Sequence, residues 1–272
     1  MITGIVDFHV HSAPSLAPRH THDPDTAIAA REAGVGTIVL KAHEGSTAER
    51  ASLLGDGVVG GVVLNSPVGG ANPDAVMVAA RLGGRVVWLP TISSLVHKAA
   101  HERPELTAHK GIHFRAVPVV DGDARVLPDW YDVFAEIAAA DLILASGHLS
   151  LDETVTMFTA ARSQGVQRFL VNHPMMDFLG WRDEHADALA QLDARIEVGV
   201  LADILTAPGR GTEHLATCYP RELLVFGSDL GHAHYPTVQE GLAEWTQRLL
   251  PVLGEDALTD VMTRNGKELL ET

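Results

Sequence analysis

Short apolar runs recur along the chain, and each is followed by a longer segment that mixes polar and apolar residues. The runs are rich in Val, Ile and Leu, a pattern typical of parallel strands that are buried on both faces. Eight such strand and helix units in one chain favour a closed α/β barrel, the (β/α)8 or TIM barrel, over an open sheet. The predicted strands are Ile5–Val10, Thr37–Leu40, Val58–Leu64, Arg85–Leu89, Leu142–Ala145, Gln167–Val171, Arg195–Val200 and Leu223–Phe226.

Two kinds of start signal mark the helices predicted between these strands. One is a capping residue followed by proline, whose fixed φ suits the first helical turn. The other is the capping box, in which a Ser precedes a Glu by one helical turn. The signals stand at Asp23-Pro24, Asn72-Pro73, Ser46 with Glu49, and Ser150 with Glu153. At the end of the chain, Thr237–Leu270 predicts two helices divided near Pro251–Glu255.

The fourth unit departs from this regular spacing. A stretch of about residues 91–128 is inserted after the fourth strand, and its AVPVVDGDARVLP sequence predicts a β-hairpin across Asp121-Gly122-Asp123. A long loop after a barrel strand commonly forms a lid or one wall of the active site, and a purely structural excursion is the alternative. We therefore expect a single domain over residues 1–272, with this insert as its main irregularity.

Length and charge narrow the classes of function. The chain has 272 residues, close to the ~250 typical of a single barrel. Its 20 Lys and Arg against 35 Asp and Glu give a formal charge of −15, which should repel nucleic acid and anionic membranes. We expect a small-molecule substrate, no nucleic-acid partner and no membrane partner, and homo-oligomer formation is left open.

The sequence also predicts a cytoplasmic location. A single cysteine, Cys218, excludes a disulfide framework, and its LATCYP surroundings favour a structural thiol over a nucleophile. The N-terminal MITGIVDFHVH has neither a basic start nor a cleavable apolar region, so we expect no signal peptide. The apolar runs are strand-sized, shorter than a membrane span requires.

Several predicted strands end in residues that can bind a metal. The first ends in His9-Val10-His11, and side chains two apart on a strand share a face, so both imidazoles should point into the barrel. The second ends in Lys41-Ala42-His43, whose Lys and His share a face in the same way. The fifth, sixth and eighth strands end in His148, His173 and Asp229.

Each of these strand ends has a simpler explanation when taken alone. A single histidine there is more often a hydrogen-bonded structural residue, and Asp229 after Ser228 is more often a turn or a cap. Five such ends in one barrel make coincidence a poor explanation, and the 15 histidines of the chain point the same way. We therefore predict a divalent metal site. Histidines in polar segments receive no role, namely His20, His22, His97, His101, His109 and His185.

The order of these residues resembles the amidohydrolase superfamily, in which the first strand carries His-x-His, the fifth and sixth each carry His, and the eighth carries Asp. The resemblance spans the whole chain on short motifs and maps these roles onto His9, His11, His148, His173 and Asp229. It implies one or two divalent ions, usually zinc, a metal-activated water as nucleophile, and Asp229 as general base. It thus implies a metal-dependent hydrolase of a small-molecule amide, lactone or related ester bond. The segments VDFHVHS, KAHEG and VNHP also look like an uncharacterised amidohydrolase-like family.

Lys41 marks a departure from that superfamily. Binuclear members carry a bridging carboxylated lysine on strand four, but the fourth strand here, RVVWLPTIS, has no lysine. Either the bridge has moved to Lys41 on strand two, or the site holds one metal and Lys41 is a cation for the substrate or the oxyanion. His43 or His173 is a further candidate for stabilising the oxyanion. Arg19 is a candidate anchor for a substrate carboxylate or phosphate, with a solvated loop arginine as the alternative.

Other activities stay open. Polymerase-and-histidinol-phosphatase (PHP) phosphoesterases also begin Asp-x-His-x-His-Ser and have a histidine after strand two, which His43 would match. They end in Asp-x-His, whereas this chain has Asp229-Leu230-Gly231-His232, and they need a carboxylate on strand three, where this chain has Asn65. Related barrels also catalyse non-oxidative decarboxylation of aromatic acids, and a barrel that only binds a ligand is a third alternative.

Overall fold

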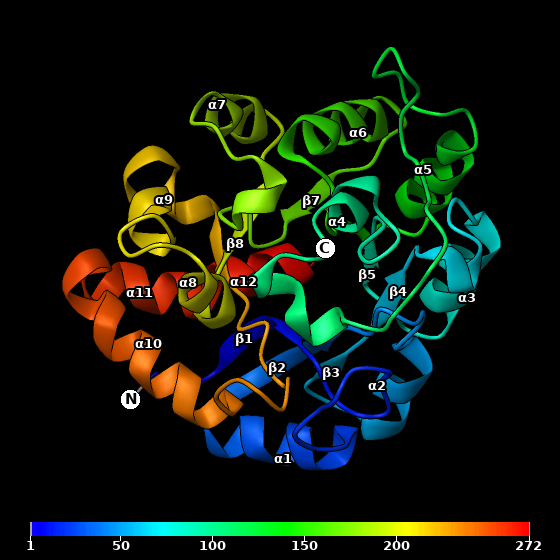
Figure 1. Cartoon of the computed structure of the whole chain (residues 1–272). Helices are drawn as coiled ribbons and strands as arrows, with labels where there is room; N and C mark the ends of the chain where they lie inside the picture. Colours follow the sequence, from blue (N-terminus) through cyan, green and yellow to red (C-terminus); the bar gives the residue numbers. More distant parts are fainter. Residues whose placement is uncertain (1, 272) are drawn as a thin grey trace.

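The computed structural model describes residues 2–271 and, within them, all side chains except those of residues 104, 105 and 108. Its strands pair in parallel and form a barrel inside a ring of helices, so the predicted (β/α)8 fold is confirmed (Figure 1). Pairing follows chain order, from β1 to β3 and from β4 to β9. The strands are β1 Ile5–Val10, β2 Val35–Leu40, β3 Val58–Val59, β4 Gly61–Val63, β5 Val86–Trp88, β6 Ile143–Ala145, β7 Arg168–Val171, β8 Arg195–Val198 and β9 Leu224–Phe226.

The third barrel position is shared by two short strands. The single strand predicted over Val58–Leu64 is broken at Gly60 into β3, which pairs with β2, and β4, which pairs with β5. A Cβ atom at Gly60 would lie 2.4 Å from the carbonyl oxygen of Thr47, so only glycine fits there. Thr47 bridges the break, because its amide donates to the carbonyl of Gly61 at 2.8 Å.

The barrel closes through residues just beyond the last strand. The amide of Asp229 donates to the carbonyl of His9 at 2.8 Å, and the amide of His11 donates to the carbonyl of Leu230 at 2.8 Å. These bonds join β1 to the continuation of β9. The closing seam therefore fixes the backbone of three predicted metal ligands.

Helices cover the outside of the barrel (Figure 1). They are α1 Asp23–Glu32, α2 Ala48–Leu54, α3 Pro73–Arg81, α4 Leu95–Ala99, α5 Trp130–Ala139, α6 Leu151–Ser163, α7 Glu184–Gln191, α8 Val200–Leu205, α9 Thr212–Cys218, α10 Val238–Leu253, α11 Glu255–Met262 and α12 Arg264–Leu270. The C-terminal segment thus forms three helices, not the predicted two, because the chain also breaks at Thr263, whose φ is −128° and ψ is −75°. Within residues 2–271, no helix combines the length and apolar character that crossing a bilayer requires.

The helix starts were predicted correctly at two of four places. Asn72 caps α3, and the capping box of Ser150 and Glu153 opens α6. The prediction is wrong at Asp23, because its carboxylate instead binds Arg50 and the N-cap position falls on His22, whose side chain forms no capping hydrogen bond. It is also wrong at Ser46, whose hydroxyl bonds the Glu49 side chain one position before the true N-cap.

Apolar side chains form an outer core against the helices and an inner core inside the barrel. The inner core consists of Val6, Phe8, Val39, Val63, Val86, Trp88, Ile143, Ala145, Leu170, Val225 and Leu269. Leu269 belongs to α12, whose last carbonyls accept from Arg85 and Arg168 at the starts of β5 and β7. Gly266 allows this close approach, since a Cβ there would lie 2.9 Å from Val6. The helix α12 therefore seals the N-terminal end of the barrel.

The long connection between β5 and α5 spans residues 89–129, and we call it the β5–α5 segment. It contains α4 and a 3-10 turn over Pro104–His109. The predicted hairpin across Asp121-Gly122-Asp123 forms as a tight turn with one antiparallel bridge, between Val120 and Val126. The segment passes over the open, C-terminal end of the barrel, where His97 of α4 meets a strand-end histidine.

Candidate metal centre

A bulge in β1 sets the direction of its two histidines. Phe8 belongs to the inner core, whereas Val10 packs in the outer core. Between Asp7 and Val10 the pairing with β2 slips by one residue, which leaves an extra residue on β1. His9 and His11 consequently point into the barrel as predicted, although strict alternation starting from Phe8 would have turned them outward.

His9, His11 and Asp229 converge at the C-terminal end of the barrel. The Nε2 atoms of the two histidines lie 3.1 and 3.2 Å from the same carboxylate oxygen of Asp229. All three side chains are buried. Their ligand atoms lie close enough to share one ion, and so do those of His9, His173 and Glu197. The residues predicted at the ends of the first and last strands are thus brought together.

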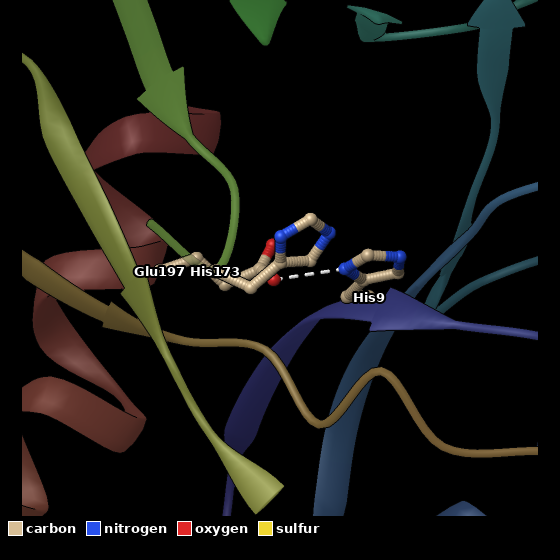
Figure 2. A group of neighbouring side chains, drawn as sticks. All are labelled: His9, His173 and Glu197. Carbon is tan, nitrogen blue, oxygen red and sulfur yellow. Dashed lines mark hydrogen bonds and ion pairs between the residues drawn. The ribbon is translucent and has the colours of Figure 1, made fainter. Parts of the chain in front are cut away.

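The outer nitrogens of both histidines are already bonded. His9 Nδ1 lies 2.8 Å from a carboxylate oxygen of Glu197 on β8 (Figure 2), and His11 Nδ1 lies 2.8 Å from the Lys41 carbonyl. An ionised carboxylate and a carbonyl only accept, so each Nδ1 donates its proton, and in a neutral ring Nε2 would present a lone pair to the centre. Burial and the charge of Arg19 hold the pKa of His11 well below its usual range, which keeps that ring neutral.

The donor set at this point fits a divalent cation. Burial alone would raise the pKa of Asp229, but His9, His173 and Lys41 outweigh it and hold the pKa below its usual range. The two Nε2 atoms thus converge on one oxygen of an ionised carboxylate, and neutral imidazoles there would need a cation between their lone pairs and that oxygen. Two nitrogens and one carboxylate oxygen, with the outer histidine nitrogens oriented by hydrogen bonds, are the ligands that zinc prefers.

Lys41 enters the centre from the end of β2. Its side chain is buried, and Nζ lies 3.1 Å from Nε2 of His9 and 5.8 Å from the centre of the Trp88 ring. Burial lowers the pKa of the Lys41 ammonium to about 8, although the carboxylates of Asp229 and Glu197 act to raise it. The lysine therefore lies where the alternation along β2 predicted it.

Two site residues have backbone conformations that side chains rarely adopt. His173 has a φ of 29° and Asp229 has a φ of 54°. Left-handed residues of this kind cost of order 1–3 kcal/mol each and cluster at functional sites. The ring of His173 stacks beside His9 with centroids 5.6 Å apart (Figure 2), and its buried Nδ1 bonds to no described residue. His173 is thus held in place with a nitrogen to offer.

His43 and His148 lie beside the centre in a second group of histidines. His43 contacts His11 with ring centroids 5.1 Å apart, and its buried Nε2 has no partner among the described residues. Nδ1 of His148 lies 2.8 Å from Nδ1 of His97, and its ring centroid lies 5.2 Å from that of His173. Neither His43 nor His148 is in a group of described ligand atoms close enough for one ion, so the ligand role of His148 stays a prediction.

Arg19 reaches toward the centre from the loop after β1. One of its terminal nitrogens lies 2.7 Å from a ring nitrogen of His232, while Nε and Nη2 are buried and bond to no described residue. Burial lowers the pKa of Arg19 to about 10, so the guanidinium stays charged at neutral pH. The alternative of a solvated loop arginine therefore does not hold.

Sequence patterns miss four residues of this region: Glu197, His97, His109 and His232. Glu197 is a lone charge inside the apolar run RIEVGV, and that signal could have marked it. His97 and His109 receive no role from the sequence because they stand in polar segments. Yet the ring of His109 contacts His43 at 4.6 Å and His97 at 5.3 Å between centroids.

Comparison with known families places the chain in one of them. Residues 4–197 match the model of a family described as a family of unknown function, DUF6282. The chain belongs to this family. The matched part of this DUF6282 protein carries the first-strand histidines, Lys41, His173 and Glu197, while Asp229 lies beyond it. No curated protein matches the chain.

Solved structures match this DUF6282 protein over nearly their whole length. A probable 2-pyrone-4,6-dicarboxylic acid hydrolase from Acinetobacter baumannii, with citric acid bound, is 12% identical at a TM-score of 0.68, over 99% of this chain and 100% of that chain. An amidohydrolase from Pseudomonas aeruginosa is 12% identical at a TM-score of 0.66, and the match covers 98% of this chain and 95% of that chain. A 2,6-dihydroxybenzoate decarboxylase from Rhizobium is 12% identical at a TM-score of 0.57, and the match covers 99% of each chain. At such identities the likeness establishes the fold.

Proposed function

We propose that the protein is a metal-dependent hydrolase of the amidohydrolase superfamily that cleaves a small-molecule amide, lactone or related ester bond. The observation that carries the proposal is the convergence of the buried Nε2 atoms of His9 and His11 on one carboxylate oxygen of Asp229, at 3.1 and 3.2 Å. Structures of similar fold that are named a hydrolase and an amidohydrolase add support.

The residues of the centre have different roles in this proposal. His9, His11 and Asp229 would hold the ion, and His173, which forms a second potential group with His9 and Glu197, is a further candidate ligand. A bound divalent ion, zinc by its donor set, supplies a water of pKa ~7 and polarises the substrate carbonyl. The ionised carboxylate of Asp229 can accept a proton and return it to the leaving group. Nε2 of His43 is available to a developing oxyanion.

Lys41 is proposed to be carboxylated. Its ammonium lies 3.1 Å from Nε2 of His9 and would compete with an ion for that nitrogen. At an effective dielectric near 20, it would repel a divalent ion some 4 Å away by about 8 kcal/mol. Addition of carbon dioxide to the amine with loss of one proton gives a carbamate anion, which removes the repulsion. Protein equilibrated with 13C-bicarbonate should show a carbamate carbon resonance that is absent from Lys41→Met. An unmodified amine in the metal-loaded protein would overturn this point.

A PHP-type phosphoesterase is less well supported. Asn65 takes the position where that family needs a carboxylate, and its amide is fully engaged. Nδ2 donates to the His43 carbonyl at 2.8 Å and to the Thr91 hydroxyl at 2.7 Å, and Oδ1 accepts from the Thr91 amide at 2.8 Å. Asn65 therefore holds the backbone around the centre and adds no charge to it.

Non-oxidative decarboxylation is the second candidate. The similar structure named a decarboxylase favours it, and so does the buried, unpaired edge of Arg19, which suits a carboxylic acid substrate. Hydrolysis releases an acid with an amine or alcohol, whereas decarboxylation releases carbon dioxide. Assaying the metal-loaded protein against cyclic amides, lactones, phosphoesters and aromatic acids separates these activities by their products.

The metal itself is tested by elemental analysis. Purified protein should carry about one to two divalent ions per chain, and His9→Ala with His11→Ala should lose them. The matched control is His22→Ala with His234→Ala, which removes two exposed histidines and should leave the metal content unchanged. Wild-type protein without metal, whose activity is unaffected by chelators, would overturn the proposed mechanism.

A further inference from the structure

The β5–α5 segment encloses a cavity next to the candidate metal centre. The cavity has a volume of about 380 Å³, within the range of small-molecule sites. The basic residues of its lining are His97, Lys98, His101, His109, Lys110 and His113. His97 and His109 also contact histidines of the centre, because their ring centroids lie 4.9 Å from His148 and 4.6 Å from His43. The cavity and the centre therefore share a wall.

This cavity has a small excess of positive charge in an otherwise acidic protein, because its described lining contains two lysines and one glutamate. Residues 91–116 contain four Lys and Arg against two Asp and Glu, and four of the 15 histidines, in a chain of formal charge −15. Glu102 is the one carboxylate among the described lining residues, and it is paired with His101 at 3.1 Å. The charge of the lining is thus complementary to an anion.

Several hydrogen-bond donors of the lining are unpaired. Both ring nitrogens of His109 are buried and bond to no described residue, and an imidazole offers at least one N–H. Lys98 Nζ donates to the Phe114 carbonyl at 2.7 Å and has two further N–H groups. The exposed Lys110 forms no ion pair with a described carboxylate. The described groups that could hold a metal lie elsewhere, so these donors favour an anion over a cation.

We propose that this cavity is a subsite for the carboxylate end of the substrate, which binds His109 and Lys110 while the bond to be cleaved lies at the metal centre. The identity of the ligand as substrate rests on the proposed function. Binding of a carboxylate in the cavity does not rest on that function, because the hydrogen-bond donors that would hold it belong to the β5–α5 segment and not to the metal ligands. The test can therefore be made without turnover.

The probe is benzoate, titrated calorimetrically into the His9→Ala, His11→Ala protein, where a carboxylate cannot bind through a metal at those ligands. We expect saturable binding of benzoate and much weaker binding of the neutral benzamide. Adding Lys110→Ala should weaken benzoate by about tenfold, the usual share of a charge-assisted hydrogen bond. The matched control is Lys267→Ala, which removes an exposed lysine from α12 at the other end of the barrel and should leave the affinity unchanged.

A second variant tests the shared wall. His109→Phe keeps an aromatic ring of similar shape and removes both nitrogens, so it should also weaken benzoate. Benzoate that binds only to metal-loaded wild-type protein, or that fails to bind any variant, would overturn the subsite while leaving the proposed hydrolase intact. Saturable Zn²⁺ binding by the His9→Ala, His11→Ala protein that disappears in His109→Phe would overturn it in favour of a cation site.

Discussion

The two ends of the barrel are built from the same strands and have opposite chemistry. At the N-terminal end, Phe8 packs against apolar neighbours and against Leu269 of α12. One residue later on β1, His9 faces a carboxylate and a lysine. Burying apolar atoms stabilises the fold, whereas burying polar atoms costs free energy unless they are paired. The protein therefore separates stability from function along the axis of the barrel.

The C-terminal end has several energetically unfavourable features beside the candidate metal ligands. Nε2 of His43 and Nδ1 of His173 are buried and bond to no described residue, and His173 and Asp229 have left-handed backbones. Each buried unsatisfied group costs about 1–3 kcal/mol. The sealed apolar end can offset such costs, and a ligand at the open end would relieve them. This contrast predicts that substitutions at the two ends affect different measurements.

The largest effect is expected from Asp229→Asn at the open end. Asparagine tolerates the left-handed φ of 54° at this position, so the backbone should be unchanged. The histidines should keep much of the metal, while kcat should fall by about 10²–10⁴-fold because the general base is lost. The measurement is kcat and metal content on one preparation, with the melting temperature as the fold control. A kcat near wild type would remove Asp229 from the mechanism, and loss of both metal and rate would make it an essential ligand.

Phe8→Ala at the sealed end should act on stability. The ring is fully buried between the strands and α12, so its removal leaves a cavity and should lower the free energy of unfolding by about 3–5 kcal/mol. Urea denaturation measures the loss, and Leu53→Ala, at a side chain 88% exposed, is the neutral control. Metal content per folded molecule should stay as in wild type. A loss below about 1 kcal/mol would mean that the two ends are not separated as the inner core indicates.

The fold could be predicted from sequence because it depends on patterns that repeat. Continuous Val, Ile and Leu runs indicate buried parallel strands wherever they occur, and eight of them imply closure. The break at Gly60 could not be predicted, because it depends on a contact with Thr47 that exists only after folding. The wrong cap at Asp23 has a similar cause: its carboxylate is taken by Arg50, which comes from a different helix.

The candidate centre was only partly predictable for the same reason. The prediction that His9 and His11 share an inward face agrees with the structure, but the bulge that turns them inward is invisible in the sequence. Lys41 follows simple alternation and lies where expected. His109 could not be predicted, because its place beside the centre depends on how the β5–α5 segment crosses the barrel opening. Local periodicity therefore locates residues on strands and says little about those on long connections.

Glu197 provides the smallest and most specific test of the comparison. It accepts from His9 Nδ1 at 2.8 Å and from Asn172 Nδ2 at 2.7 Å. Its carboxylate also lies close enough to His9 and His173 for the three to share one ion. We expect the His9 contact to hold the ring and its proton so that Nε2 keeps a lone pair for the ion. Glu197 of β8 thus orients His9, which belongs to β1.

We expect Glu197→Gln to weaken metal binding by about 10–100-fold, the usual effect of removing such a partner, without abolishing it. Glutamine keeps the size and one acceptor, but it lacks the negative charge that strengthens the His9 ring as a ligand, and its amide N–H groups would face the donor of Asn172. Competition with a zinc chelator measures the affinity. Glu153→Gln, at the capping box of α6, removes a carboxylate away from the centre and should change stability but not metal affinity. An unchanged affinity in Glu197→Gln would show that His9 orients itself without its partner, and the open end would then depend on its ligands alone.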